Sequence, residues 1–254
     1  MKEVTVRGLT LGSGRPKICV PVVGRSLPEI LSQADRLPPL NPDLCEWRVD
    51  WFAGAADPQL LLSAARTVRE ALPRLPLLFT FRTQAEGGRQ SLSREQYLDI
   101  CRLLMTSGCC DLIDLELFTV GDDAVSLLEE AHASGVLVVL SNHDFEATPP
   151  EGELLRRLSL MDSLPADLSK IAVMPRSPED VLALLSATCR ARQTAEHPII
   201  TMSMGPMGAV SRVCGELFGS CLTFGSAGHT SAPGQIPVRE LRNMMELLRP
   251  GQPD

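Results

Sequence analysis

Residues 136–174 begin with the apolar segment "VLVVLSNH" (136–143) and end with a second one, "LSKIAVM" (168–174). Both segments have the length and the β-branched content of buried strands, and the residues between them leave room for one helix. Two strands joined by a helix are the unit from which parallel sheets are built. This stretch therefore predicts an α/β fold with a parallel sheet.

The same unit recurs over the whole chain of 254 residues, because patterns typical of helices, as at 58–72 and 93–108, separate the apolar segments. Eight such units in about 250 residues match the size of a (β/α)8 barrel. We predict a TIM barrel in a single domain, residues 1–254. The other expected strands are "KICVPVVG" (17–24), "LCEWRVDWF" (44–52), "PLLFTFRT" (76–83), "LIDLELF" (112–118), "PIITMSM" (198–204) and "LTFG" (222–225).

The segment before the first unit alternates like a strand, and we interpret residues 1–15 as an N-terminal β-hairpin that closes the bottom of the barrel. A doubly wound open sheet is the alternative fold. Such a sheet usually carries a glycine-rich turn after its first strand, whereas "LGSGRP" (11–16) precedes the first expected strand.

Composition narrows the class of protein. The net charge of −7 argues against nucleic acid or an anionic membrane as a partner. No apolar run approaches the roughly 18 to 20 residues that span a bilayer, and the N-terminus lacks the apolar core of a signal peptide, so a cytoplasmic location is expected. The eight cysteines and four histidines show no metal-ligand spacing, and we expect no metal site.

Lysine is rare in this chain: three lysines stand against 21 arginines, and only Lys170 lies beyond residue 17. Arginine stays protonated, but a desolvated lysine can lose its proton and attack a carbonyl. An amine inside an apolar strand, in a chain that otherwise uses arginine, is therefore a candidate nucleophile.

Polar residues alternate along the expected strands, and in a barrel enzyme the catalytic groups project from the C-terminal strand ends. His143 ends one expected strand, and Lys170 lies in the next one. Imine chemistry requires an amine beside a group that can carry a proton. Scaffolding is the alternative, with Lys170 paired to Glu116 or Glu46. The other polar strand residues are Glu46, Arg48, Asp50, Thr80, Arg82, Asp114, Glu116 and Ser141.

The last third of the chain offers an anion clamp and a lid. Arg212 lies near the start of an expected helix after the seventh strand, where a carboxylate or phosphate is favoured. The loop at 226–237 is rich in Gly, Ser and Pro, and its Ser231 and Gln235 can donate hydrogen bonds to a substrate.

Seven stretches, in order and over nearly the whole chain, make the sequence resemble type I 3-dehydroquinate dehydratase of the shikimate pathway, which is the route of aromatic amino acid biosynthesis. They are "EWRVD" (46–50), "FTFRTQAEGG" (79–88), "IDLELF" (113–118), "SNHDFEATP" (141–149), "KIAVMP" (170–175), "ITMSMG" (200–205) and "SAPGQI" (231–236).

The resemblance implies a (β/α)8 barrel, usually a homodimer, that needs no metal or organic cofactor. It implies conversion of 3-dehydroquinate to 3-dehydroshikimate by syn elimination of water. Lys170 would form a Schiff base, His143 would be the general acid and base, and Glu86 would orient His143. Arg212 would hold the substrate carboxylate. The remaining substrate-binding residues would be Glu46, Arg48, Arg82, Ser231 and Gln235.

Two departures from the family pattern stand out. Pro21 occupies a position near the end of the first strand where the family often has Ser, and the lid lacks the lysines common before Ser231. Two rival functions remain at this point: a class I aldolase, which also uses a Schiff-base lysine, and a noncatalytic scaffold protein. An aldolase often has a late phosphate-binding glycine-rich stretch where this chain has "SAPGQI", and a scaffold protein need not keep Lys170 and His143.

Overall fold

The structure is a computed structural model that describes residues 2–249. Eight parallel strands stand side by side in chain order, and β9 meets β10 through a parallel bridge between Ile199 and Ser220 and a 2.8 Å hydrogen bond from the Cys221 N–H to the Ile199 carbonyl. The sheet thus curls into the predicted barrel, and the open-sheet alternative is wrong. The strands are β3 (Lys17–Val22), β4 (Leu44–Arg48), β5 (Leu77–Thr80), β6 (Leu112–Glu116), β7 (Leu137–Asp144), β8 (Leu168–Val173), β9 (Ile199–Ser203) and β10 (Leu222–Ser226), and β11 (Ile236–Pro237) adds to β10.

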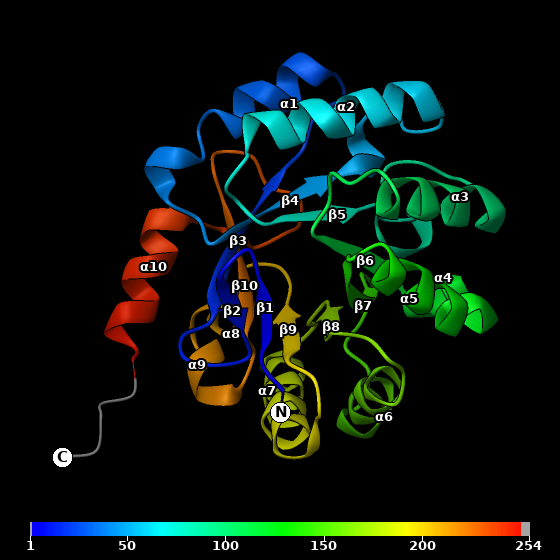
Figure 1. The fold of residues 1–254 in the computed structure, drawn as a ribbon. Helices are drawn as coiled ribbons and strands as arrows, with labels where there is room; N and C mark the ends of the chain where they lie inside the picture. Colours follow the sequence, from blue (N-terminus) through cyan, green and yellow to red (C-terminus); the bar gives the residue numbers. More distant parts are fainter. Residues whose placement is uncertain (1, 250–254) are drawn as a thin grey trace.

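Helices surround this sheet (Figure 1). A capping box formed by Ser93 and Gln96 begins α3, and Ser177 with Asp180 forms another at the start of α7. Within residues 2–249, no helix combines the length and apolar character needed to cross a membrane. The helices are α1 (Leu27–Ala34), α2 (Pro58–Ala71), α3 (Arg94–Met105), α4 (Leu117–Val120), α5 (Ala124–Ala133), α6 (Glu151–Asp162), α7 (Pro178–Thr194), α8 (Ala209–Val213), α9 (Gly215–Phe218) and α10 (Val238–Leu247). Short 3₁₀ turns lie at Pro38–Leu40, Val49–Trp51, Gln84–Glu86 and Gly121–Asp123.

The N-terminal hairpin fills the bottom of the barrel. Strands β1 (Val4–Val6) and β2 (Leu9–Leu11) pair antiparallel around a two-residue turn in which both Arg7 and Gly8 have positive φ. The side chains of Val6 and Leu11 pack on the inward-facing residues at the start of the barrel strands. The lower interior is therefore apolar, and the polar inward positions are gathered at the upper, C-terminal strand ends. The lower layer consists of Leu44, Leu78, Leu112, Val139, Leu168, Ile200 and Leu222.

Candidate active site

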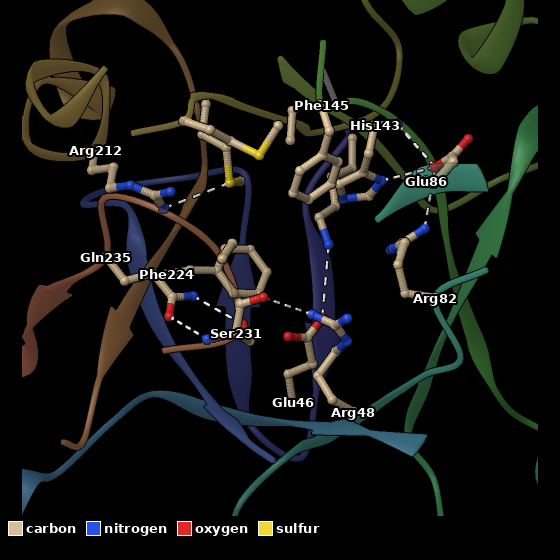
Figure 2. Close-up of a pocket in the computed structure, with 15 residues that line it drawn as sticks. Glu46, Arg48, Arg82, Glu86, His143, Phe145, Arg212, Phe224, Ser231 and Gln235 are labelled. Atoms are coloured by element: carbon tan, nitrogen blue, oxygen red, sulfur yellow. Dashed lines mark hydrogen bonds and ion pairs between the residues drawn. The ribbon is translucent and has the colours of Figure 1, made fainter. Parts of the chain in front are cut away.

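A cavity lies at the C-terminal ends of the strands, inside the barrel, where the fold was expected to place its chemistry. All nine predicted site residues line it, although they come from positions as far apart in the sequence as 46 and 235. Figure 2 shows Arg212 and Gln235 on one side of this cavity and His143 and Glu86 on the other. The nine are Glu46, Arg48, Arg82, Glu86, His143, Lys170, Arg212, Ser231 and Gln235.

Lys170 points into the barrel from β8 and is only 3% exposed. Its Nζ donates a hydrogen bond to Asp114 Oδ2 at 3.0 Å, lies 3.8 Å from Glu46 Oε1, and sits 4.6 Å from the centre of the Phe224 ring. Of the two acids named as partners in the scaffolding alternative, Glu46 lies near the amine, but the nearest acid is Asp114. Glu116 instead accepts a hydrogen bond from Arg82.

Asp114, on β6, is fully buried and is shared by two cations. Arg82 Nη2 lies 2.7 Å from its Oδ1, and the Ser141 hydroxyl donates to the same oxygen at 2.6 Å. Burial alone would raise the pKa of Asp114, but Arg82, Lys170 and the Ser141 hydrogen bond outweigh it and hold the pKa at about 2. Asp114 is thus a fixed negative charge beside the amine.

His143 is oriented by Glu86. The Glu86 carboxyl accepts the His143 backbone N–H and contacts the ring Nδ1, both at 2.9 Å, and Asn142 Nδ2 donates to its other oxygen. With Nδ1 turned to Glu86, Nε2 is the ring nitrogen that can exchange a proton with a ligand.

Burial and the positive charges of Arg82, Lys170 and Arg48 lower the pKa of His143 well below 6.5. Burial also raises the pKa of Glu86, against the opposing effect of Arg82. Glu86 nevertheless accepts hydrogen bonds from the His143 backbone N–H, Asn142 and Arg82, as an ionised carboxylate does, so the neutral ring carries its proton on Nδ1 and leaves Nε2 unprotonated. His143 is therefore a neutral imidazole near pH 7, the form that can accept a proton.

The three arginines of the cavity differ in how their charge is balanced. Arg48 binds Asp50 through two hydrogen bonds, at 2.8 and 2.9 Å. Arg82 contacts three carboxylates, those of Asp114, Glu116 and Glu86.

Arg212 has no acidic partner within residues 2–249, and its Nε is buried without a hydrogen bond there. Burial lowers the pKa of Arg212 to about 10, which still leaves the guanidinium charged at pH 7. A buried, unbalanced cation with an unsatisfied N–H is a site for an anion. Arg212 lies in the last turn of α8. The expectation that it lies near the start of a helix, where the helix N-terminus would help to bind an anion, was therefore wrong.

The loop between β10 and β11 covers the cavity through its main chain. Arg48 Nη1 donates to the Ser231 carbonyl at 3.2 Å, and Arg212 Nη2 donates to the Pro233 carbonyl at 2.9 Å. Within the loop, Gln235 Nε2 donates to Ser231 Oγ at 3.0 Å and its Oε1 accepts the Ser231 N–H (Figure 2). The two arginines on the barrel thus hold the loop in place.

Sequence reasoning missed most of the apolar lining of the cavity. The alternation of the seventh strand correctly predicts that Met202 and Met204 point inward. Their residue type, however, does not distinguish a cavity wall from a core. Neither Pro21 nor His229 lines the cavity. The apolar lining is Phe145, Ala172, Met202, Met204, Phe224 and Ala232.

The part of the chain that the structure describes holds no group of three or more His, Cys, Asp or Glu side chains arranged to bind a metal ion. The two acids that line the cavity face cations instead: Glu46 Oε1 lies 3.8 Å from Lys170 Nζ, and Glu86 Oε2 lies 3.3 Å from Arg82 Nη1.

Comparison with known proteins links this geometry to one family. The family described as "Type I 3-dehydroquinase" matches residues 18–251. A 3-dehydroquinate dehydratase of Listeria monocytogenes is 47% identical over 248 residues, which is 98% of each chain. One from Klebsiella pneumoniae is 49% identical over 246 residues, covering 96% of this chain and 98% of that one. The crystal structure of the type I 3-dehydroquinate dehydratase of Clostridium difficile, with covalently modified comenic acid, matches with a TM-score of 0.93 and 45% identity over 97% of each chain.

Proposed function

Since the chain belongs to the type I 3-dehydroquinase family, we propose that it converts 3-dehydroquinate to 3-dehydroshikimate and water through an imine formed on Lys170. The observation that carries this proposal is the buried amine of Lys170, set one strand away from a neutral imidazole in the cavity at the C-terminal strand ends. An aldolase function lacks such support, because the Listeria monocytogenes and Klebsiella pneumoniae relatives, which match over nearly the whole chain, are 3-dehydroquinate dehydratases.

Imine formation begins when the neutral amine of Lys170 attacks the ring ketone. Loss of water from the adduct gives a protonated C=N bond, which draws electrons from the neighbouring carbon and makes its C–H acidic. Arginine cannot take this role, because its guanidinium stays protonated. The need for an amine explains why a lysine stands here in a chain that otherwise uses arginine.

His143 then removes the acidic proton through Nε2, with Glu86 holding its ring, and returns a proton to the departing hydroxyl on the same face. One residue thereby serves as base and acid in turn, which fits a syn elimination. The conjugated imine is hydrolysed, and the product and the free amine of Lys170 are released.

The substrate carboxylate binds Arg212, because the other two arginines already have the buried carboxylates of Asp50 and Asp114 as partners. The hydroxyl groups of the ring have donors and acceptors around them in the remaining polar side chains. These are Glu46, Arg48, Arg82, Ser231 and Gln235.

The direct test is incubation of the purified protein with 3-dehydroquinate, following the conjugated enone of the product by ultraviolet absorbance. An absorbance rise that depends on the enzyme supports the proposal. Its absence, with a protein that is folded by circular dichroism, would rule the proposed reaction out.

Arg212→Lys is expected to lower kcat/KM by roughly 10- to 150-fold, mainly through KM. The lysine keeps a positive charge but loses one charge-assisted hydrogen bond of the guanidinium fork, worth about 1.5–3 kcal/mol. Steady-state kinetics checks this, and Arg212→Ala should cost more. If Arg212→Ala leaves kcat/KM unchanged, Arg48 or Arg82 is the better candidate for the carboxylate.

The pH dependence of kcat/KM should follow His143 in the free enzyme. Because its pKa is lowered, the imidazole stays neutral as the pH falls from 7 toward 6, and kcat/KM should be lost only below pH 6.5. Initial rates at substrate concentrations well below KM, between about pH 4.5 and 8, measure this. An acidic limb with a midpoint above 6.5 would contradict the assignment of His143 as the base.

Three further properties are part of the proposal. We expect a homodimer, as the family pattern implies, and a cytoplasmic protein acting in the shikimate pathway. We also expect residues 1–254 to act as one domain with residues 226–237 as its lid. Sedimentation equilibrium of the purified protein tests the dimer.

A further inference from the structure

We propose that Asp114 is a further catalytic residue: it is the fixed counter-ion that stabilises the positively charged imine nitrogen of Lys170. This inference rests on the proposed function, because it concerns the same nitrogen atom. It assigns a role to a buried carboxylate that the steps at Lys170 and His143 do not use.

The contact itself is direct. Asp114 Oδ2 lies 3.0 Å from Lys170 Nζ, and Asp114 and Lys170 come from β6 and β8, on either side of β7. The nitrogen that becomes the imine is already at the distance of a charge-assisted hydrogen bond from this oxygen. Glu46, at 3.8 Å, is the only other acid that forms an ion pair with this amine within residues 2–249.

The carboxylate is held so that it cannot turn away or pick up a proton. Its other oxygen, Oδ1, is bound by Arg82 at 2.7 Å and by the Ser141 hydroxyl at 2.6 Å. Oδ2 is therefore free to face Nζ, and the charge remains through the reaction. Preorganised charge of this kind, on a fully buried carboxylate, stabilises the charge that develops during a reaction.

The charge on the nitrogen changes at each step, which defines what Asp114 can do. The amine is neutral when it attacks, the imine is positive, the enamine formed after proton removal is neutral, and the conjugated imine is positive again. A negative charge 3.0 Å away lowers the free energy of the two positive states.

Asp114→Asn tests this role, because the amide can still accept from Arg82 and Ser141 but carries no charge. Two results are expected together. First, kcat should fall by about 10- to 100-fold, since the imine loses a charged partner. Second, the fraction of enzyme that borohydride traps as the adduct at saturating substrate should fall, since the positive imine is less stable without the carboxylate.

Glu116→Gln is the matched control, because Glu116 binds the same Arg82 at 3.0 Å but does not contact Lys170. It should leave the trapped fraction close to that of the unmodified enzyme. Ser141→Ala provides a milder variant in case Asp114→Asn does not fold: it removes one hydrogen bond from the carboxylate and should lower kcat less, with Lys170 still trappable.

The outcomes separate this inference from the proposed function. If the unmodified enzyme forms no adduct with 3-dehydroquinate and borohydride, the proposed function itself fails. If it does form the adduct, and Asp114→Asn keeps both the rate and the trapped fraction of the unmodified enzyme, only the role of Asp114 is overturned. Equal effects of Asp114→Asn and Glu116→Gln on kcat and on the trapped fraction would show that Asp114 merely anchors Arg82.

Discussion

Lys170→Ala is expected to abolish turnover of 3-dehydroquinate, with kcat falling by on the order of 10⁶-fold, the scale on which enzymes respond to loss of a covalent nucleophile. Without the amine no imine can form, and nothing else in the cavity can act as an electron sink for the ring. The arginines stay protonated, and His143 can remove only a proton that the imine has made acidic.

Borohydride trapping identifies the residue independently of rate. In the unmodified protein, borohydride with substrate should leave one secondary amine on Lys170, located by mass spectrometry after digestion. Lys17→Ala, which changes a lysine at the start of β3 outside the cavity, should trap and turn over normally. An adduct on Lys2 or Lys17, or none, would contradict the imine mechanism.

His143→Ala should slow turnover by about 10²–10⁴-fold, the usual contribution of a general acid–base group. The imine should still form, because Lys170 and Asp114 are untouched, and the adduct should accumulate in place of product. Rapid quenching with borohydride measures the adduct, and enone absorbance measures the product.

His229→Ala is the control for that variant. His229 lies in the lid sequence but outside the cavity, so its loss should leave the rate of elimination close to that of the unmodified enzyme. Full turnover by His143→Ala, together with a large loss in His229→Ala, would show that His229 is the base.

The fold could be predicted because the strand-helix repeat is strong at every unit. Parallel strands buried on both faces read as continuous apolar runs, and inward polar residues interrupt those runs at fixed spacing. Glu46 and Arg48 on β4, and Asp114 and Glu116 on β6, follow that spacing, and the structure places all four inside the barrel. The nine site residues follow from the same geometry combined with the family resemblance.

The pairing among these residues could not be predicted. Alternation says that a side chain faces inward, but the partner depends on how strands stagger around the barrel and on side-chain length. Arg48 therefore binds Asp50 and not Glu46, which accepts from Thr80. Lys170 reaches Asp114, two strands away, for the same reason. The apolar lining was missed because Met, Phe and Ala are as common in a core as in a cavity wall.

The hydrogen bonds from Arg48 and Arg212 to the lid main chain have a consequence for association kinetics. As the proposed lid, residues 226–237 would release the contacts of the Ser231 and Pro233 carbonyls before a molecule entering the barrel reaches Lys170. Opening of the loop then becomes a separate step ahead of capture, and the bimolecular rate constant should fall below the roughly 10⁸–10⁹ M⁻¹s⁻¹ limit set by diffusion. Solvent viscosity should therefore have little influence on kcat/KM, because the rate is set inside the protein and not by the encounter.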